Sequence, residues 1–279
     1  IVRDDTVAVP AANMARAGKD HEEMRRFVGI TRKVSIQSAD LCEHKMPLLD
    51  FVAHAMPTKG MQEAETQAMI RTAGLDGEAR VLVSTNPAIP PRAVIEKVGD
   101  RTIKPSIPGW EFQRAIANEA VGKDSIELQI GGKTFSYRSQ HVCAAIPLYR
   151  LEAEPKTFNM GYASDRFIVT LARNPKPDLG PRSDDEIAFL VAMQVAAAAG
   201  GKLDDAMSVR NVLLVASGII PVMQLLNPVI GRPLMNSLVN QREIDALAVR
   251  MLDQSGFDIE KGMSGHLARC GDLCGKAWP

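Results

Sequence analysis

Apolar residues recur at helical spacing through much of this chain, and capping residues mark where several helices begin. Asp20 and Glu23 stand at capping-box spacing, and the segment HEEMRRFVGI that follows places its apolar residues on one face. A second capping box, Ser183 with Glu186, precedes the strongly apolar segment IAFLVAMQVAAAA, which Gly200 closes. Similar patterns predict further helices at residues 47–56, 61–73, 90–99, 165–173, 205–216, 221–226 and 242–254.

Strand patterns are confined to the middle of the chain. Residues 79–87, ARVLVSTNP, form a short buried run that ends in an Asn-Pro pair. The segment SIELQIGGKTFSYR contains a two-residue Gly131-Gly132 turn, which predicts a β-hairpin with apolar residues on one face and polar residues on the other. The predicted register pairs Ile126 with Tyr137, Glu127 with Ser136, Leu128 with Phe135 and Gln129 with Thr134.

Together these elements predict a mostly α fold with a small β-hairpin element, in the α+β class. The helical core is expected to have two lobes, with the boundary between residues 150 and 165, after the hairpin region and before the later helices. Both ends lack a clear period and are interpreted as extended arms. The predicted divisions are an N-terminal arm at 1–19, an N-terminal lobe at 20–155, a helical C-terminal lobe at 156–260 and a C-terminal arm at 261–279.

The most apolar stretch of the chain, residues 201–233, could be a membrane span, a core or an assembly surface. A spanning helix needs roughly 20 mostly apolar residues, and Pro221 interrupts the run before it reaches that length. We therefore interpret the stretch as core or assembly contact, with no membrane partner. A tryptophan near the chain end would serve as an anchor in a neighbouring copy. The assembly candidates are Val212, Leu213, Ile219, Ile220, Met223, Leu234 and Trp278.

Composition limits the function without identifying it. The 33 Lys and Arg residues equal the 33 Asp and Glu residues, so any contact with a polyanion must come from a local basic surface. Four cysteines in 279 residues do not resemble a disulfide framework and suggest a reduced setting. The acidic start IVRDDTVAVP does not resemble a signal peptide, so secretion by that route is not expected.

No motif in the chain predicts a catalytic residue, a cofactor or a small-molecule substrate. Gly132-Lys133-Thr134 resembles the end of a phosphate-binding loop, but position 127, where that loop needs a glycine, is Glu127. The hairpin turn accounts for both glycines without a nucleotide. Neither a nucleophile elbow nor a zinc-protease motif is present.

The pairs of cysteine and histidine residues allow an alternative interpretation, in which they are metal ligands. Thiolates and imidazoles suit zinc, but no C-x-x-C pair occurs, and buried free cysteines are common core residues. We therefore predict no metal and keep a metal-dependent enzyme, with its site at the lobe interface, as an alternative. The residues concerned are Cys42, His44, His141, Cys143, His266, Cys270 and Cys274.

Basic residues occur in local pairs and helical rows, and this pattern allows two interpretations. They can form ordinary surface ion pairs, or several can converge on a groove that binds a phosphate backbone. A coat protein needs few positive charges per subunit because assembly repeats them, so net neutrality is compatible with the second reading. The candidates are Arg25, Arg26, Arg32, Lys33, Arg138, Arg166, Arg173 and Arg210.

The segment LDDAMSVRNVLLVASGIIP, residues 203–221, resembles a stretch of the nucleoproteins of tospoviruses, which are plant-infecting negative-strand RNA viruses. The resemblance covers about twenty residues and contains one basic residue, Arg210. It implies a helical protein that polymerises through its arms and holds RNA between two lobes. We accordingly expect a self-assembling coat or nucleocapsid protein whose partners are its own copies and RNA, located in a virion or the host cytoplasm. A nucleic-acid-free assembly subunit is a further alternative.

Overall fold

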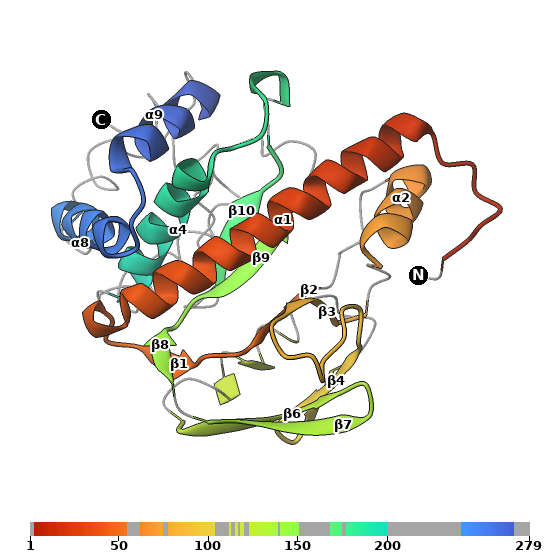
Figure 1. Cartoon of the computed structure of the whole chain (residues 1–279), viewed down its shortest axis with the longest axis horizontal. Coiled ribbons are helices and arrows are strands. Elements are labelled where there is room, and N and C mark those ends of the chain that lie inside the picture. The colour runs from red at the N-terminus through yellow and green to blue at the C-terminus, as the bar shows by residue number, and fades with distance from the viewer. Residues whose placement is uncertain are drawn as a thin grey trace, which may run out of the picture.

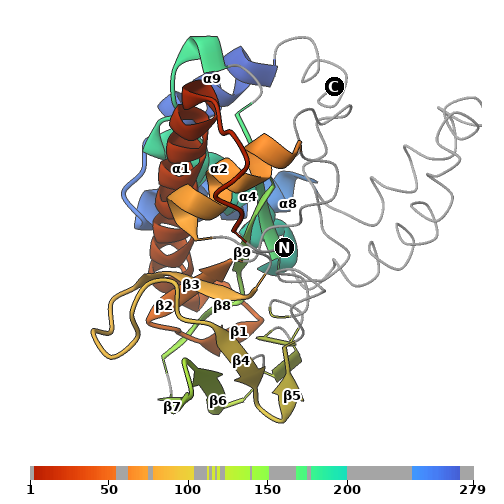
Figure 2. The same ribbon diagram turned by 90° about the vertical axis from the view of Figure 1, so that its right-hand side faces the viewer.

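The computed structural model describes residues 3–54, 62–74, 78–103, 112, 115–116, 118–119, 123–138, 140–150, 168–174, 177–199 and 241–270. Within these ranges the chain is an α+β protein, as predicted, with five α-helices and ten short strands. Figure 1 shows the helices α1, α4, α8 and α9 together, and Figure 2 shows the strands β4 to β7 at the opposite end of the molecule. The helices are α1 (Ala11–Gln37), α2 (Glu63–Ala73), α4 (Asp184–Ala199), α8 (Gln241–Gln254) and α9 (Ile259–Cys270).

The strands form one four-stranded sheet and three pairs. The sheet has the order β5-β4-β6-β7, and the pairs are β1 with β8, β2 with β3, and β9 with β10. The β9–β10 pair is parallel, whereas the other pairings are antiparallel. The strands are β1 (Lys45–Pro47), β2 (Phe51–His54), β3 (Arg80–Ser84), β4 (Ile95–Val98), β5 (Arg101–Thr102), β6 (Ser125–Ile130), β7 (Lys133–Arg138), β8 (His141–Cys143), β9 (Ile146–Arg150) and β10 (Ile168–Ala172).

Helix α4 is the centre of the helical core. It contacts α1, α8, α9 and β10, and every described side chain from Ile187 to Ala196 is buried except Phe189, which is partly buried. A helix that is apolar all round must be enclosed by other elements, which explains why four of them surround it. Its first turn is capped as predicted, since the Glu186 backbone N–H donates to Ser183 Oγ at 3.1 Å.

A second core fills the β end of the molecule. Its buried residues come from β1 to β4, β6 to β9 and the residues near Ile116. The predicted hairpin is confirmed in all four predicted pairs of β6 with β7. Gly131 and Gly132 have φ angles of 56° and 75°, the left-handed values that a tight two-residue hairpin turn requires.

Three predicted helices are strands in the structure. The predicted helix at 47–56 is replaced by the end of β1 and by β2, that at 90–99 by β4, and that at 165–173 by β10. In β10, Val169 and Leu171 are both buried, which is the alternation of a strand. The segments at 90–99 and 165–173 each contain three β-branched residues, and in all three segments pairing with a neighbouring strand outweighed a weak helical spacing. The predicted helices at 61–73 and 242–254 and the strand at 79–87 are confirmed as α2, α8 and β3.

The predicted arms are partly wrong. Helix α1 begins at Ala11 rather than after Asp20, and α9 occupies 259–270, so residues 11–19 and 261–270 are not extended. The N-terminal residues also contact their own chain, because Arg71 Nη2 donates to the carbonyl oxygens of Asp4 and Val7. The predicted lobe boundary at residue 155 lies outside the described residues, and α1 shares one core with α4 and α8.

Cys42 and Cys143 form a disulfide, with their Cα atoms 5.4 Å apart. This corrects the prediction that the cysteines are free, and it removes both thiolates from any metal site. The bond joins the segment before β1 to β8, which are already paired as antiparallel strands. Sequence spacing could not reveal the pairing because 101 residues separate the two cysteines.

The apolar stretch at 201–233 and all seven assembly candidates lie outside the described residues. None of the helices in the described part of the chain is long and apolar enough to cross a membrane.

Candidate nucleic-acid interface

The outward face of α1 carries exposed lysine and arginine side chains. In Figure 1 the helix runs diagonally across the front of the molecule, and Figure 2 shows it along one edge. Two rows at seven-residue spacing follow it, Lys19–Arg26–Lys33 and Arg25–Arg32. Seven residues correspond to about 10 Å along a helix, with the side chains on nearly the same face.

The acidic residues of the same helix mostly point inward. Asp20 and Glu23 are each 7% exposed, whereas Glu22 is the single exposed carboxylate in α1. Arg173, at the end of β10, lies 2.7 Å from Asp20 Oδ2. Arg182 lies 3.0 Å from Glu23 Oε1. The fold thus neutralises the inner carboxylates and leaves Lys19, Arg25 and Lys33 exposed.

A buried network extends these two ion pairs into the helical core. Arg173 also contacts Glu65 of α2 at 2.6 Å, and the Tyr149 hydroxyl of β9 donates to Glu23. Burial raises the pKa of Asp20, and the positive charge of Arg173 opposes that rise. Because buried charges are stable only when paired, these contacts fix the side of α1 that faces the core.

The network continues to the C-terminal helices. Arg269 of α9 donates from Nε to Glu186 Oε2 at 2.9 Å, and Arg182 lies 3.7 Å from the same carboxylate. Helix α9 approaches α4 closely at Gly262, where an added Cβ would lie 2.5 Å from the Asp185 carbonyl oxygen. The ion pairs and this close approach together hold α9 on α4.

The candidate RNA-binding residues differ in their accessibility. Arg25 is exposed, and Lys33 is exposed with its Nζ 4.2 Å from the centre of the Phe257 ring. Arg26 is partly buried and donates to Asp184 Oδ1 at 2.8 Å. Arg173 is 4% exposed between two carboxylates, so its prediction as a phosphate contact is wrong. Arg166 and Arg210 lie outside the described residues, and only the backbone of Arg138 is described, in β7.

Two exposed cations of α1 are absent from the predicted RNA-binding residues. Arg16 and Lys19 precede the predicted helix start at Asp20 and fall within the predicted N-terminal arm. The seven-residue spacing from Lys19 to Arg26 and Lys33 is a signal that could have found one of them, because it continues the helical period towards the N-terminus.

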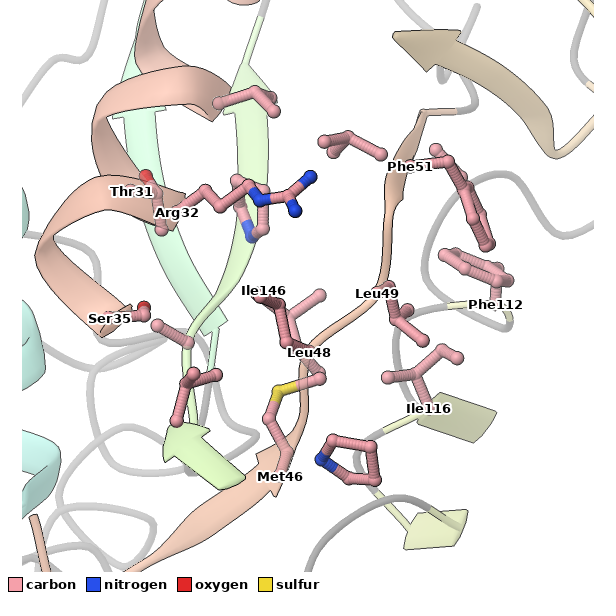
Figure 3. Close-up of a pocket in the computed structure, with 17 residues that line it drawn as sticks. Thr31, Arg32, Ser35, Met46, Leu48, Leu49, Phe51, Phe112, Ile116 and Ile146 are labelled. Atoms are coloured by element: carbon pink, nitrogen blue, oxygen red, sulfur yellow. The ribbon is translucent and has the colours of Figure 1, made fainter. Parts of the chain in front are cut away.

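Arg32 lies beside a pocket between the helical core and the β core, shown in Figure 3. The pocket is lined mainly by apolar side chains from β1, β2, β8, β9 and the residues near Ile116, with four residues from α1, and its cavity volume is about 70 Å³. No ion pair to Arg32 is formed by the residues that the structure describes.

The histidines and cysteines do not converge on a metal site in the described ranges, where no group of three possible ligands is found. Cys42 and Cys143 are joined to each other. His44 immediately precedes β1 in the chain, and His141 Nε2 is 3.7 Å from Asp124 Oδ1. His266 is buried in α9, only the backbone of Cys270 is described, and Cys274 lies outside the described residues.

His266 provides a pH-dependent test of the α4–α9 packing. Burial, with a contribution from the charge of Arg182, lowers the pKa of His266 to about 4. The unfolded histidine has a pKa of about 6.5, so between those values the unfolded chain binds a proton that the folded chain does not. We expect His266 to reduce the free energy of unfolding by about 3 kcal/mol as pH falls from about 6.5 to about 4.

This expectation is measured as a difference between the unmodified protein and His266→Gln in urea unfolding at several pH values. The variant cannot take up that proton, so the stability difference between the two proteins should change with pH over this window. A constant difference would contradict the assignment of a neutral, buried imidazole.

Comparisons with protein families, with curated proteins and with solved structures found no match to this chain.

Proposed function

We propose that this chain is a self-assembling coat or nucleocapsid protein that packages RNA without sequence specificity, with the outward face of α1 as a phosphate-binding surface. The observation that carries the proposal is the separation of charge on α1. Its inner acidic residues Asp20 and Glu23 are paired with buried arginines, while Lys19, Arg25 and Lys33 are exposed. A neutral chain thereby presents a locally cationic surface.

A row of cations on one helix face favours backbone contact over base reading. Lysine and arginine side chains at successive turns can follow phosphates, and such contacts carry no sequence information. Repetition of the surface in a polymer of subunits would multiply a weak contact per subunit into a strong one. The copies of the chain itself therefore remain the second proposed partner.

The test uses fluorescence anisotropy with a labelled single-stranded oligouridylate over a range of salt concentrations. We expect the triple variant Lys19→Gln, Arg25→Gln, Lys33→Gln to bind more weakly. Each lost phosphate contact should also reduce the slope of log affinity against log salt by about 0.7, or about 2 for all three.

The matched control removes three positive charges at the other end of the molecule, with Lys97→Gln, Lys123→Gln and Lys133→Gln. These side chains lie on or beside the four-stranded sheet and are exposed. The control should retain the salt slope of the unmodified protein. Equal weakening by both triple variants, or no RNA binding at low salt, would overturn the role of α1.

Assembly is tested separately on the purified full-length chain by sedimentation and negative-stain imaging. A filament or closed particle with a high ratio of absorbance at 260 nm to that at 280 nm supports a nucleocapsid. Particles without nucleic acid would favour a protein-only assembly subunit, and a monomer would exclude both.

A further inference from the structure

The pocket beside Arg32 lies where the two cores meet. Val28 belongs to the helical core, whereas Met46, Phe51 and Ile146 belong to the β core. Figure 3 shows α1 on one side of the hollow and the β1–β2 segment on the other, with the Arg32 side chain extending from the helix across the space between them. Small-molecule sites are commonly apolar hollows of this kind with a few polar groups that orient the ligand.

The polar groups at this pocket come from one helix face. Arg32 and Ser35 line it from adjacent positions on successive turns of α1. The Ser35 side chain is 3% exposed, and its Oγ has no hydrogen-bond partner within the described part of the chain. Thr31 also lines the pocket, but its hydroxyl already donates to the Phe27 carbonyl oxygen at 2.9 Å. Arg32 and Ser35 therefore supply the available donors.

We propose that this pocket binds a straight-chain monocarboxylate, with the hydrocarbon tail against the apolar walls and the carboxylate at Arg32. Arginine presents a planar pair of donors that matches a carboxylate. A phosphate dianion fits less well, because Arg32 is the one cation among the described residues that line the pocket. A wholly apolar ligand would leave both polar groups unpaired.

The first experiment compares sodium octanoate with 1-octanol by isothermal titration calorimetry on the full-length chain. The structure predicts saturable one-to-one binding of octanoate and a weaker interaction with the uncharged alcohol. Arg32→Gln should weaken octanoate binding by roughly 10- to 100-fold, the range for a hydrogen bond to a charged group, without changing the affinity for 1-octanol.

Arg25→Gln is the matched control, because it removes the same charge from the same helix but does not line the pocket. It should change octanoate binding less than twofold. If Arg25→Gln and Arg32→Gln weakened octanoate binding equally, the loss would come from the overall charge of the helix, and the proposed contact of Arg32 with the carboxylate would be overturned. Equal affinity for octanoate and 1-octanol in the unmodified protein would overturn it as well.

A second pair of measurements places the ligand. Ala145 is a partly buried lining residue between β8 and β9, and Ala145→Leu should fill part of the hollow and abolish octanoate binding. In protein with labelled methionine methyl groups, octanoate should shift the resonance of Met46, which lines the pocket, and leave that of Met193 in α4 unchanged.

The length of the ligand's hydrocarbon tail provides a further test of its contact with the apolar walls. Each added methylene from butanoate to octanoate should tighten binding roughly fourfold while it enters the pocket, as expected for burial of a CH₂ group. No saturable octanoate binding by the folded, unmodified protein would overturn the proposal. An unchanged Met46 resonance or full binding by Ala145→Leu would do the same. RNA binding by the α1 triple variant is an independent measurement, since that variant retains Arg32.

Discussion

Replacement of both Cys42 and Cys143 by alanine is expected to lower the free energy of unfolding by about 4 to 5 kcal/mol. The two cysteines are 101 residues apart, and a cross-link that closes a loop of that length restricts the unfolded chain strongly. The loss is larger than most single substitutions cause, because it acts on the unfolded state of more than a third of the chain. Urea unfolding under oxidising conditions measures it.

Reduction provides the control for this prediction. The unmodified protein should lose similar stability when a phosphine reductant is added, whereas the double alanine variant should not respond at those two positions. Peptide mapping without reductant should recover the fragments containing Cys42 and Cys143 as one linked species. Free thiols at both positions in the oxidised protein would contradict the pairing.

Arg173→Met is expected to destabilise the protein by about 3 to 5 kcal/mol, the range for breaking a buried ion pair from one side. Arg173 is 4% exposed and lies 2.7 Å from Asp20 and 2.6 Å from Glu65. Methionine fills similar space without a charge, so the two carboxylates would remain near one another without their cation. Thermal or urea unfolding measures the loss.

Two further variants separate this effect from a general effect of charge. Arg25→Met removes a cation from the exposed face of α1 and should change stability by less than about 0.5 kcal/mol. Adding Asp20→Asn to Arg173→Met should recover part of the loss, because one of the two stranded carboxylates becomes neutral. If Arg173→Met were as stable as Arg25→Met, the buried network would have no structural role.

The network also connects stability to the proposed function. Asp20 and Glu23 lie on the same helix as the exposed cations and anchor its inner face through Arg173 and Arg182. The same inner face buries Met24, Phe27 and Val34, so ion pairs and apolar packing together hold α1 with its cationic rows outward. Arg173 and Arg182 neutralise the inner acids, so the charges that a polyanion can reach on α1 are mainly positive.

Local patterns in the sequence determined the elements that depend on near neighbours. The Gly131-Gly132 turn and the alternation around it defined the register of β6 and β7, because a two-residue turn and the pleat leave one consistent pairing. The Ser183–Glu186 box and the unbroken apolar run after it likewise defined the start of α4. The overall α+β class followed from such segments.

Tertiary structure decided the features that depend on residues far apart in the chain. Residues 168–172 became β10 because β9 offers a parallel partner, and that partner is invisible in a local helical spacing. Cys42 forms a disulfide with Cys143, 101 residues away in the sequence, and Arg173 forms an ion pair with Asp20 of α1. The sequence by itself determined how many charges α1 carries and at what spacing. Only the packing of α1 against α2 and α4 decided which charges are neutralised inside and which face the solvent. Burial of a charge depends on distant partners that supply the opposite charge.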